Sequence, residues 1–234
     1  MGMPVTLEVV GGDQSTDEQV FEYLLGVDRT FSTYKSDSAI SRINRGELTR
    51  GEAPVEVRQV LADCDEMRLR TNGYFDIRRG DAIDPSGLVK GWSIGEAAKL
   101  LDAAGVHNYC LEAGGDIVVR GNNADGEKWR VGIRNPRRKN EIVKVLKVTD
   151  MAVATSGTYE RGEHIYDPHT GKAATAWLSL TVVGSEIVPA DVFATAACAM
   201  GGGGPGWVAK QGLECYAIGH DETAVFTPGL ERFL

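Results

Sequence analysis

The chain has 234 residues, 42% hydrophobic and 25% charged, a composition typical of a globular protein of one large domain or two small ones. Its 33 acidic residues outnumber the 25 basic ones, giving a net charge of −8 that disfavours a nucleic-acid-coating or anionic-membrane-surface role. The four cysteines (Cys64, Cys110, Cys198 and Cys215) form no C-x-x-C pair. Scattered single cysteines indicate a reducing compartment rather than a disulfide scaffold or a zinc site.

The N-terminal segment MGMPVTLEVVGG lacks the basic stretch and apolar run of a signal peptide. No segment approaches the ~18 consecutive apolar residues of a membrane span. We therefore expect a cytoplasmic protein, or the leaderless form of an exported one. Because hydrophobic residues are spread along the whole chain, we expect one domain, residues 1–234, with one shared core.

Hydrophobic periodicity and turn residues predict helices early, strands in the middle and one late helix. The predicted elements are a strand at 4–10, a helix at 16–30 that starts from a Thr16 cap, a polar loop at 31–44, helices at 54–71 and 91–104, strands at 108–113, 116–121, 128–134, 142–148, 151–156 and 177–184, a helix at 190–200, and strands at 214–220 and 223–227. This order predicts an α+β fold with a mixed or antiparallel sheet rather than a regular βαβ alternation.

Three familiar motifs lack the neighbouring residues or secondary structure that they require. Residues 201–206 satisfy G-x-G-x-x-G literally, but they follow a predicted helix instead of a strand, so helix termination and a flexible turn explain them better. Gly171-Lys172 is followed by alanine and does not complete a P-loop. His164 and His169 are five residues apart with no neighbouring cysteine, which is poor zinc spacing.

The first segment that points to chemistry is Asp84–Trp92, a tight turn that enters the helix predicted at 91–104. Such a turn exposes backbone N–H groups at the positive end of the helix dipole and favours an anion such as phosphate. Lys90 adds a positive charge there. An Asp-Pro turn that merely starts a helix explains the same residues equally well.

A second segment, His164–Gly171, places His164 and Asp167 three residues apart in a turn that contains proline and glycine. A histidine oriented by a carboxylate could act as a general base toward a hydroxyl. A polar surface turn with an incidental histidine is the alternative.

The third segment is the predicted helix at 190–200, where Asp191 and Thr195 lie four residues apart on one face. They are the only side-chain oxygens in an otherwise apolar stretch, and a carboxylate plus a hydroxyl makes a good partial shell for Mg²⁺. The alternative is that Asp191 complements the helix N-terminus and Thr195 bonds back to the helix backbone.

Seven blocks, in this order, resemble the ApbE family of FAD:protein FMN transferases over nearly the whole chain. The blocks are FSTYKSDSAISRIN (Phe31–Asn44), GYFD (Gly73–Asp76), DPSGLVKGW (Asp84–Trp92), LEAGGDI (Leu111–Ile117), ATSGTYE (Ala154–Glu160), HIYDPHTG (His164–Gly171) and ADVFATAACAMG (Ala190–Gly201). The resemblance implies an ApbE-like, T-fold-related α+β fold with a mixed or antiparallel sheet, packed helices and no Rossmann motif.

The resemblance also implies the site residues. The nucleotide site would be lined by residues from the whole length of the chain: Met1, Tyr34, Tyr74, Phe75, Asp76, Asp84, Lys90, Glu112, Gly114, Gly115, Asp116, Ser156, His164 and Ile165. The backbone carbonyl of Gly87, with Asp191 and Thr195, would hold Mg²⁺, and His164 and Asp167 would lie beside the scissile phosphate. Many family members carry an acidic or hydroxyl residue just before the threonine, where this chain has Ala194.

The activity implied is the magnesium-dependent transfer of FMN from FAD to a Ser or Thr hydroxyl of an acceptor protein, with release of AMP. If water replaces the acceptor, the same site becomes an FAD pyrophosphatase. A non-catalytic FAD-binding or FAD-delivery protein and a relative that has lost FAD are the remaining alternatives. Neither nucleic acid nor a membrane span is expected.

Overall fold

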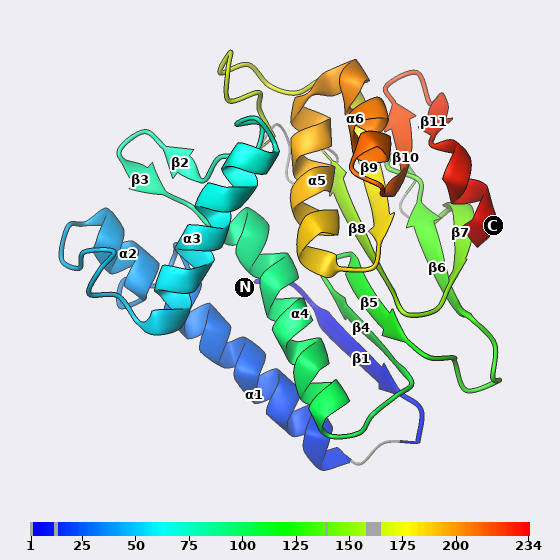
Figure 1. The fold of residues 1–234 in the computed structure, drawn as a ribbon, viewed down its shortest axis with the longest axis horizontal. Coiled ribbons are helices and arrows are strands. Elements are labelled where there is room, and N and C mark those ends of the chain that lie inside the picture. The colour runs from blue at the N-terminus through cyan, green and yellow to red at the C-terminus, as the bar shows by residue number, and fades with distance from the viewer. Residues whose placement is uncertain (1, 12–13, 139, 158–164) are drawn as a thin grey trace.

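The computed structural model describes residues 2–11, 14–138, 140–157 and 165–234. In these ranges the chain forms a seven-stranded sheet in the order β1-β4-β5-β8-β9-β10-β11, with every neighbouring pair antiparallel (Figure 1). The strands are β1 (Val5–Val9), β4 (Tyr109–Ala113), β5 (Asp116–Arg120), β8 (Met151–Gly157), β9 (Trp177–Gly184), β10 (Glu214–Gly219) and β11 (Ala224–Phe226). The predicted α+β class is confirmed.

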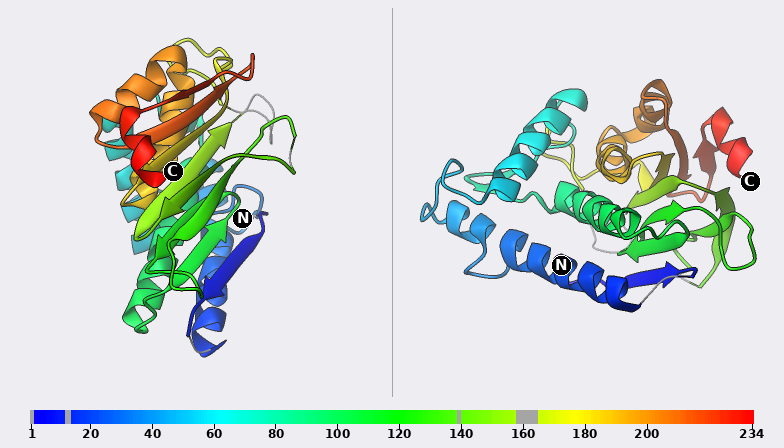
Figure 2. Two further views of the ribbon diagram at one scale, coloured as in Figure 1. Left: turned by 90° about the vertical axis from the view of Figure 1, so that its right-hand side faces the viewer. Right: turned by 60° about the horizontal axis from the view of Figure 1, so that its bottom comes forward.

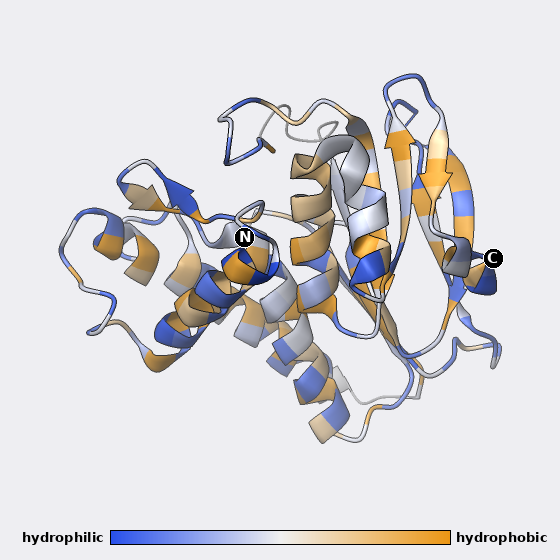
Figure 3. Cartoon of the chain, turned by 45° about the horizontal axis from the view of Figure 1, so that its top comes forward, coloured by the Kyte–Doolittle hydropathy of each residue, from blue (hydrophilic) through white to orange (hydrophobic). Residues whose placement is uncertain are grey.

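Helices cover one face of this sheet (Figure 1). They are α1 (Gln14–Phe31), α4 (Ser86–Ala103), α5 (Ile187–Ala199) and α6 (Gly204–Lys210). Their apolar residues pack on alternate strand residues such as Leu111, Val118 and Leu180, and apolar residues are concentrated along α5 and the strands behind it (Figure 3). Among the helices that the structure describes, none is both long and apolar enough to cross a membrane.

A two-stranded ribbon, β6 (Trp129–Arg134) and β7 (Ile142–Val148), covers the opposite face together with the 3₁₀ helix η2 (Pro228–Phe233) (Figure 2). Residues on β6 alternate between buried and exposed, as expected for a ribbon with one dry face. The buried residues pack on Val153, Val183 and Ile218 of the sheet. The middle of the sheet is therefore buried on both faces, whereas Thr6 and Glu8 on the edge strand β1 are exposed.

A third apolar cluster lies beyond the sheet, among the helices α2 (Ala39–Asn44) and α3 (Val55–Arg70) and the neighbouring parts of α1, α4 and α5. A short hairpin, β2 (Arg78–Arg79) and β3 (Ala82–Ile83), connects α3 to α4 (Figure 1). The helix predicted at 54–71 is confirmed as α3, and it is followed by Asn72-Gly73, where both residues have positive φ (53° and 82°).

The structure corrects three local predictions. Helix α1 begins at Gln14, so Thr16 lies inside the helix and is not its cap. The predicted loop 31–44 contains α2, capped by Ser38, whose hydroxyl accepts from Ser41 N at 3.0 Å. Helix α4 begins at Ser86 rather than at residue 91, because tertiary packing outweighs the low helix propensity of the glycines in its first turns.

The glycine tract joins two helices. Gly201 has a φ of +64° and ends α5, the 3₁₀ helix η1 (Gly201–Gly203) follows, and α6 starts at Gly204. The tract follows a helix, as predicted, so it is not a dinucleotide fingerprint. The expected flexible turn is wrong, because half of the tract is a 3₁₀ turn and the rest opens a helix that sequence periodicity missed.

Replacing Gly204 should destabilise the fold. A Cβ at this position would lie 2.1 Å from the Ala197 carbonyl oxygen, a backbone atom of α5 that cannot move alone. We expect Gly204→Ala to lower the free energy of unfolding in urea by about 2–3 kcal/mol. Gly206→Ala, in the same helix with no atom near its Cβ, is the control and should raise it by about 0.5–1 kcal/mol. Equal effects of the two substitutions would contradict this packing argument.

Candidate functional site

Helices α4 and α5 approach closely at Gly91. A Cβ on Gly91 would lie 3.0 Å from both Cβ and Oδ2 of Asp191 and 3.2 Å from the Ile187 carbonyl oxygen. The Gly91 N–H instead donates to Asp191 Oδ2 at 2.9 Å. Asp191 is 2% exposed, so the backbone of one helix fixes a buried carboxylate of the other.

Lys90, the neighbour of Gly91, lies between two buried carboxylates. Its Nζ is 2.7 Å from Asp116 Oδ2 and 3.4 Å from Asp191 Oδ1. Asp116 comes from the start of β5, and its Oδ1 accepts from Thr155 N of β8 at 3.1 Å. The Lys90 side chain is 20% exposed, whereas those of Asp116 and Asp191 are 0% and 3% exposed. Three elements thus bring two negative charges and one positive charge together.

Burial and close contact shift the pKa values of Asp191 and Lys90. Burial and the neighbouring Asp116 raise the pKa of Asp191 to about 8, against the opposing effects of Lys90 and the Gly91 amide. Burial lowers the pKa of Lys90, but the two carboxylates outweigh burial and the net shift is upward. Asp116 Oδ2 makes no contact of hydrogen-bond geometry with any residue that the structure describes, although Lys90 is within ion-pair distance. A further cation would satisfy these oxygens.

Two other predicted metal ligands lie close to Asp191 along the helices. Thr195 is one turn further along α5, and its Oγ1 is 2.8 Å from Ser156 Oγ of β8. Gly87 is one turn before Gly91 on α4, and because helix carbonyls point toward the C-terminus, its oxygen faces the turn that contacts Asp191. Ala194 is fully buried in the core beneath α5.

The donor set fits a hard cation such as Mg²⁺. It offers a carboxylate of Asp191, the hydroxyl of Thr195 and the carbonyl of Gly87, with Asp116 nearby. The ranges that the structure describes contain no group of three or more His, Cys, Asp or Glu side chains able to hold a metal. That finding is compatible with Mg²⁺, which keeps several water or phosphate oxygens and needs only one or two protein carboxylates.

Asp167 is bound within its own turn. Its Oδ1 accepts from His169 N at 2.9 Å, and its Oδ2 accepts from the Thr170 hydroxyl at 3.0 Å. Neighbouring Ile165 is buried in the core under the helices. His164 lies outside the described residues, so its predicted contact with Asp167 stays a prediction.

The turn that contains Asp167 packs beside the segment that enters the β2–β3 hairpin. The rings of Tyr74 and His169 meet edge to face with centroids 4.6 Å apart. Arg79 donates to the Tyr166 hydroxyl at 2.5 Å, and its guanidinium lies 4.8 Å from the centre of that ring. The sequence analysis missed His169 and Arg79, since no spacing rule links segments about ninety positions apart.

Three other predicted nucleotide-site residues have structural partners. Phe75 is 4% exposed and packs in the helical cluster beside α4. Burial raises the pKa of Asp76, but hydrogen bonds from Arg78 at 2.5 Å and Arg68 at 2.9 Å outweigh it and lower the pKa to about 2. Asp84 Oδ1 accepts from Ser86 N at 3.0 Å, at the start of α4. Their contacts with FAD stay predictions.

The remaining predicted residues lie in loops or at strand ends. Tyr34, in the loop between α1 and α2, is 97% exposed. Gly114 and Gly115 form the β4–β5 turn with φ of 58° and 90°, and the side chain of Met3 covers Gly114. Glu112 is half-buried on β4, and Met1 lies outside the described residues. The turn leads directly into Asp116.

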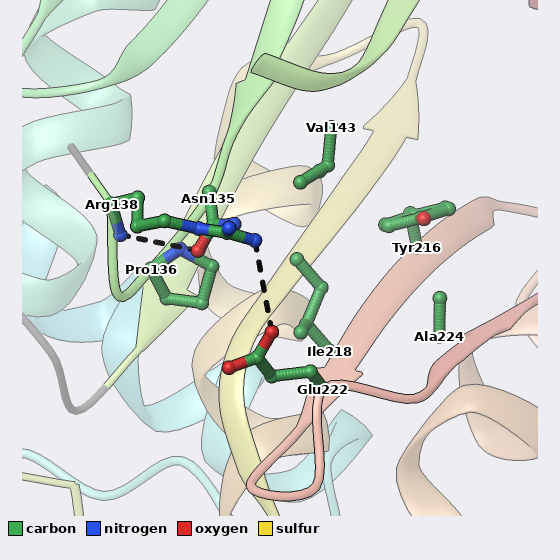
Figure 4. Close-up of a pocket in the computed structure, with 8 residues that line it drawn as sticks. All are labelled: Asn135, Pro136, Arg138, Val143, Tyr216, Ile218, Glu222 and Ala224. Carbon is green, nitrogen blue, oxygen red and sulfur yellow. Dashed lines mark hydrogen bonds and ion pairs between the residues drawn. The ribbon is translucent and has the colours of Figure 1, made fainter. Parts of the chain in front are cut away.

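A separate cavity of about 140 Å³ lies on the ribbon-covered face of the sheet (Figure 4). Tyr216, Ile218 and Val143 line its apolar side, while Arg138 pairs with Glu222 at 3.8 Å across its rim. None of the predicted site residues lines this cavity. The candidate site is therefore the polar cluster at the α4–α5 crossing, on the opposite face.

Comparison with known families decides the family of the chain. The model of the ApbE family matches residues 1–82 and 78–217, which together are most of the sequence. The chain belongs to the ApbE family. All seven sequence blocks that carried the resemblance lie inside the matched ranges.

Curated ApbE relatives are named FAD:protein FMN transferase. The protein from Klebsiella pneumoniae (strain 342) is 27% identical, over 93% of this chain and 82% of the relative. The protein from Vibrio cholerae serotype O1 is 35% identical over 67% of this chain, and the match spans half of that relative.

Solved ApbE structures share the fold. The flavin transferase ApbE from Vibrio cholerae superposes with a TM-score of 0.85 at 23% identity, covering 100% of this chain and 96% of that one. The ApbE protein from Thermotoga maritima gives a TM-score of 0.83 at 20% identity, covering 99% and 98%. The ApbE-like fold without a Rossmann motif is thus confirmed.

The Asp191 pKa predicts how stability of this ApbE chain depends on pH. Between the ordinary carboxyl pKa near 4 and about 8, the folded state holds a proton on Asp191 that the unfolded state releases. Stability from this group is therefore lost as the pH rises toward 8. We expect Asp191→Asn to match the wild type in urea unfolding with EDTA at pH 5, and to exceed it by about 1–3 kcal/mol at pH 8.5.

The control for that measurement is Asp150→Asn. Asp150 is exposed, and its carboxylate accepts from Gly121 N in a turn of positive φ that asparagine also adopts. It measures how the loss of a carboxylate outside the cluster affects unfolding under the same two conditions. A difference from the wild type that is the same at pH 5 and pH 8.5 for Asp191→Asn would show that the Asp191 carboxyl titrates normally.

Proposed function

We propose that this chain is a magnesium-dependent FAD:protein FMN transferase, which moves FMN from FAD to a Ser or Thr hydroxyl of an acceptor flavoprotein and releases AMP. The observation that carries the proposal is the buried cluster of Lys90, Asp116 and Asp191 with Thr195 beside it. The cluster supplies a cation for a phosphate and oxygens for a metal at one crossing of two helices. Membership of a family whose curated members are named for this activity supports the same conclusion.

The reaction needs little covalent help from the protein. The acceptor oxygen forms a bond to the FMN phosphorus while the bond from that phosphorus to the bridging oxygen breaks, and AMP leaves with the electron pair. A phosphate with a second pKa of about 6 is a good leaving group. Catalysis then depends on charge neutralisation, in-line positioning and removal of the hydroxyl proton.

Different residues of this chain would neutralise charge, position the substrate and remove the proton. The Lys90 ammonium, the one partly exposed group of the cluster, would contact a phosphate oxygen. Asp191, Thr195 and the Gly87 carbonyl would hold Mg²⁺, which would neutralise pyrophosphate charge. His164, oriented by Asp167, would take the proton of the acceptor hydroxyl. We propose that a single domain, residues 1–234, carries all these groups.

The proposal is tested by incubating the purified chain with FAD, Mg²⁺ and a threonine-containing acceptor protein and weighing every species by mass spectrometry. The acceptor should gain the mass of one FMN, AMP should appear, and EDTA should abolish both. Free FMN and AMP with an unmodified acceptor would favour the pyrophosphatase. FAD that stays bound and intact would favour the carrier, and no flavin binding would refute the proposal.

Removing the Thr195 hydroxyl should weaken the metal site specifically. Thr195→Val keeps the side-chain shape but loses one oxygen ligand, so we expect the Mg²⁺ concentration for half-maximal turnover to rise about tenfold or more. The matched control is Thr181→Val. Thr181 makes an equivalent hydroxyl pair with Thr155 at 2.8 Å, but on the ribbon side of the sheet. A larger magnesium effect from Thr181→Val than from Thr195→Val would place the metal elsewhere.

A further inference from the structure

We propose that Asp116 is a positioning residue that acts through Lys90: its buried carboxylate holds the ammonium at the mouth of the site while Asp191 is left to the metal. This inference rests on the proposed function and deepens it. It assigns Asp116 a task other than direct contact with the nucleotide.

The charged groups Lys90, Asp116 and Asp191 differ in how deeply they are buried, and this difference indicates different roles. Asp116 has no exposed surface, and Asp191 is almost as deeply buried, whereas Lys90 keeps a fifth of its side-chain surface open. A phosphate that approaches from solvent therefore meets Lys90 before either carboxylate. Lys90, not Asp116, is therefore placed to contact a substrate directly.

Asp116 is also well fixed. It follows the Gly114-Gly115 turn directly, and its Oδ1 is bound by the Thr155 N–H of the neighbouring strand β8. The other oxygen, Oδ2, has Lys90 Nζ at 2.7 Å and makes no hydrogen bond within the residues that the structure describes. One oxygen anchors the carboxylate to the sheet, and the other is left for the ammonium.

The two carboxylates hold Lys90 unequally. The contact to Asp116 is 0.7 Å shorter than the 3.4 Å contact to Asp191 (3.4 − 2.7), and Asp191 is bound through its other oxygen to Gly91 N. A divalent cation on Asp191 would repel the ammonium and cancel that carboxylate's attraction for it. Asp116 keeps Lys90 in place under those conditions, so the metal and the lysine can act on the same pyrophosphate.

The test compares Asp116→Asn, Lys90→Met and the double variant in FMN transfer. Asparagine preserves the shape and the acceptor for Thr155 N but removes the charge on Oδ2. We expect kcat/KM for FAD to fall about 100-fold in Asp116→Asn, as for a misplaced catalytic group. Since Asp116 acts through Lys90, the double variant should lie within about threefold of Lys90→Met alone. If the losses of kcat/KM in the two single variants instead multiply in the double variant, the inference is wrong.

A second readout uses FAD binding in EDTA, followed by flavin fluorescence. Without Asp116, the ammonium should move to Asp191 and leave the phosphate, so Asp116→Asn should bind FAD about tenfold more weakly, the value of one charge-assisted hydrogen bond. A carboxylate that only added negative charge near the pyrophosphate would have the opposite effect, and its removal would tighten binding. Unchanged or tighter binding therefore contradicts the proposal.

Asp150→Asn is the matched control, because it too removes a carboxylate that accepts a backbone N–H at a strand end but has no role at the site. It should leave transfer and FAD affinity unchanged. A crystal structure of Asp116→Asn gives a measurement independent of activity, and should place Lys90 Nζ closer to Asp191 than to residue 116. A wild-type chain without FAD turnover would refute the proposed function, and the crystal structure alone would then decide this inference.

Discussion

The close approach of α4 and α5 is the constraint on which the site depends. The absence of a side chain at Gly91 lets the Asp191 carboxylate reach the backbone of α4. The same contact brings Asp191 beside Lys90, the residue that precedes Gly91 in the sequence. A larger residue at Gly91 would move the helices apart and separate a carboxylate from its cation.

The charge balance of this cluster distinguishes it from an ordinary buried ion pair. A buried pair of one cation and one anion gains little net stability after desolvation. Here two carboxylates share one ammonium, and burial together with the neighbouring Asp116 raises the pKa of Asp191 to about 8. Such an imbalance is unfavourable in the free protein and becomes favourable when a cation binds, which is typical of functional sites.

The packed strands and helices of the fold hold the charged residues of the candidate site. The middle of the sheet is covered on both faces, by the ribbon β6–β7 and η2 on one side and by the helices on the other. Asp116 and Ser156 point from this rigid sheet toward α4 and α5, and each meets a helix residue, Lys90 or Thr195. Functional side chains on packed elements are held more accurately than side chains on loops. By contrast, Tyr34 and the turn at Asp167 lie on connecting segments.

The class of fold and most of the strands could be predicted from the sequence, because alternating apolar residues between glycine and asparagine turns are a local signal. It also placed Asp191 and Thr195 on one face of a helix, since four-residue spacing fixes that relation, and its ordered blocks identified the family. Local patterns did not predict the early start of α4 or the continuation of the glycine tract into α6, where tertiary packing outweighs glycine's low helix propensity. They also missed the short helix α2, which lies in a polar segment.

The pairing of the charges could not be predicted from the sequence and depends on the tertiary structure. The contacts of Lys90 with Asp116, of Asp191 with Gly91, and of Asp116 with Thr155 join residues 26 to 100 positions apart (116 − 90, 191 − 91). No periodicity encodes such distances. They arise because strand order and the helix crossing bring these segments together, and burial then makes each charge depend on its neighbours.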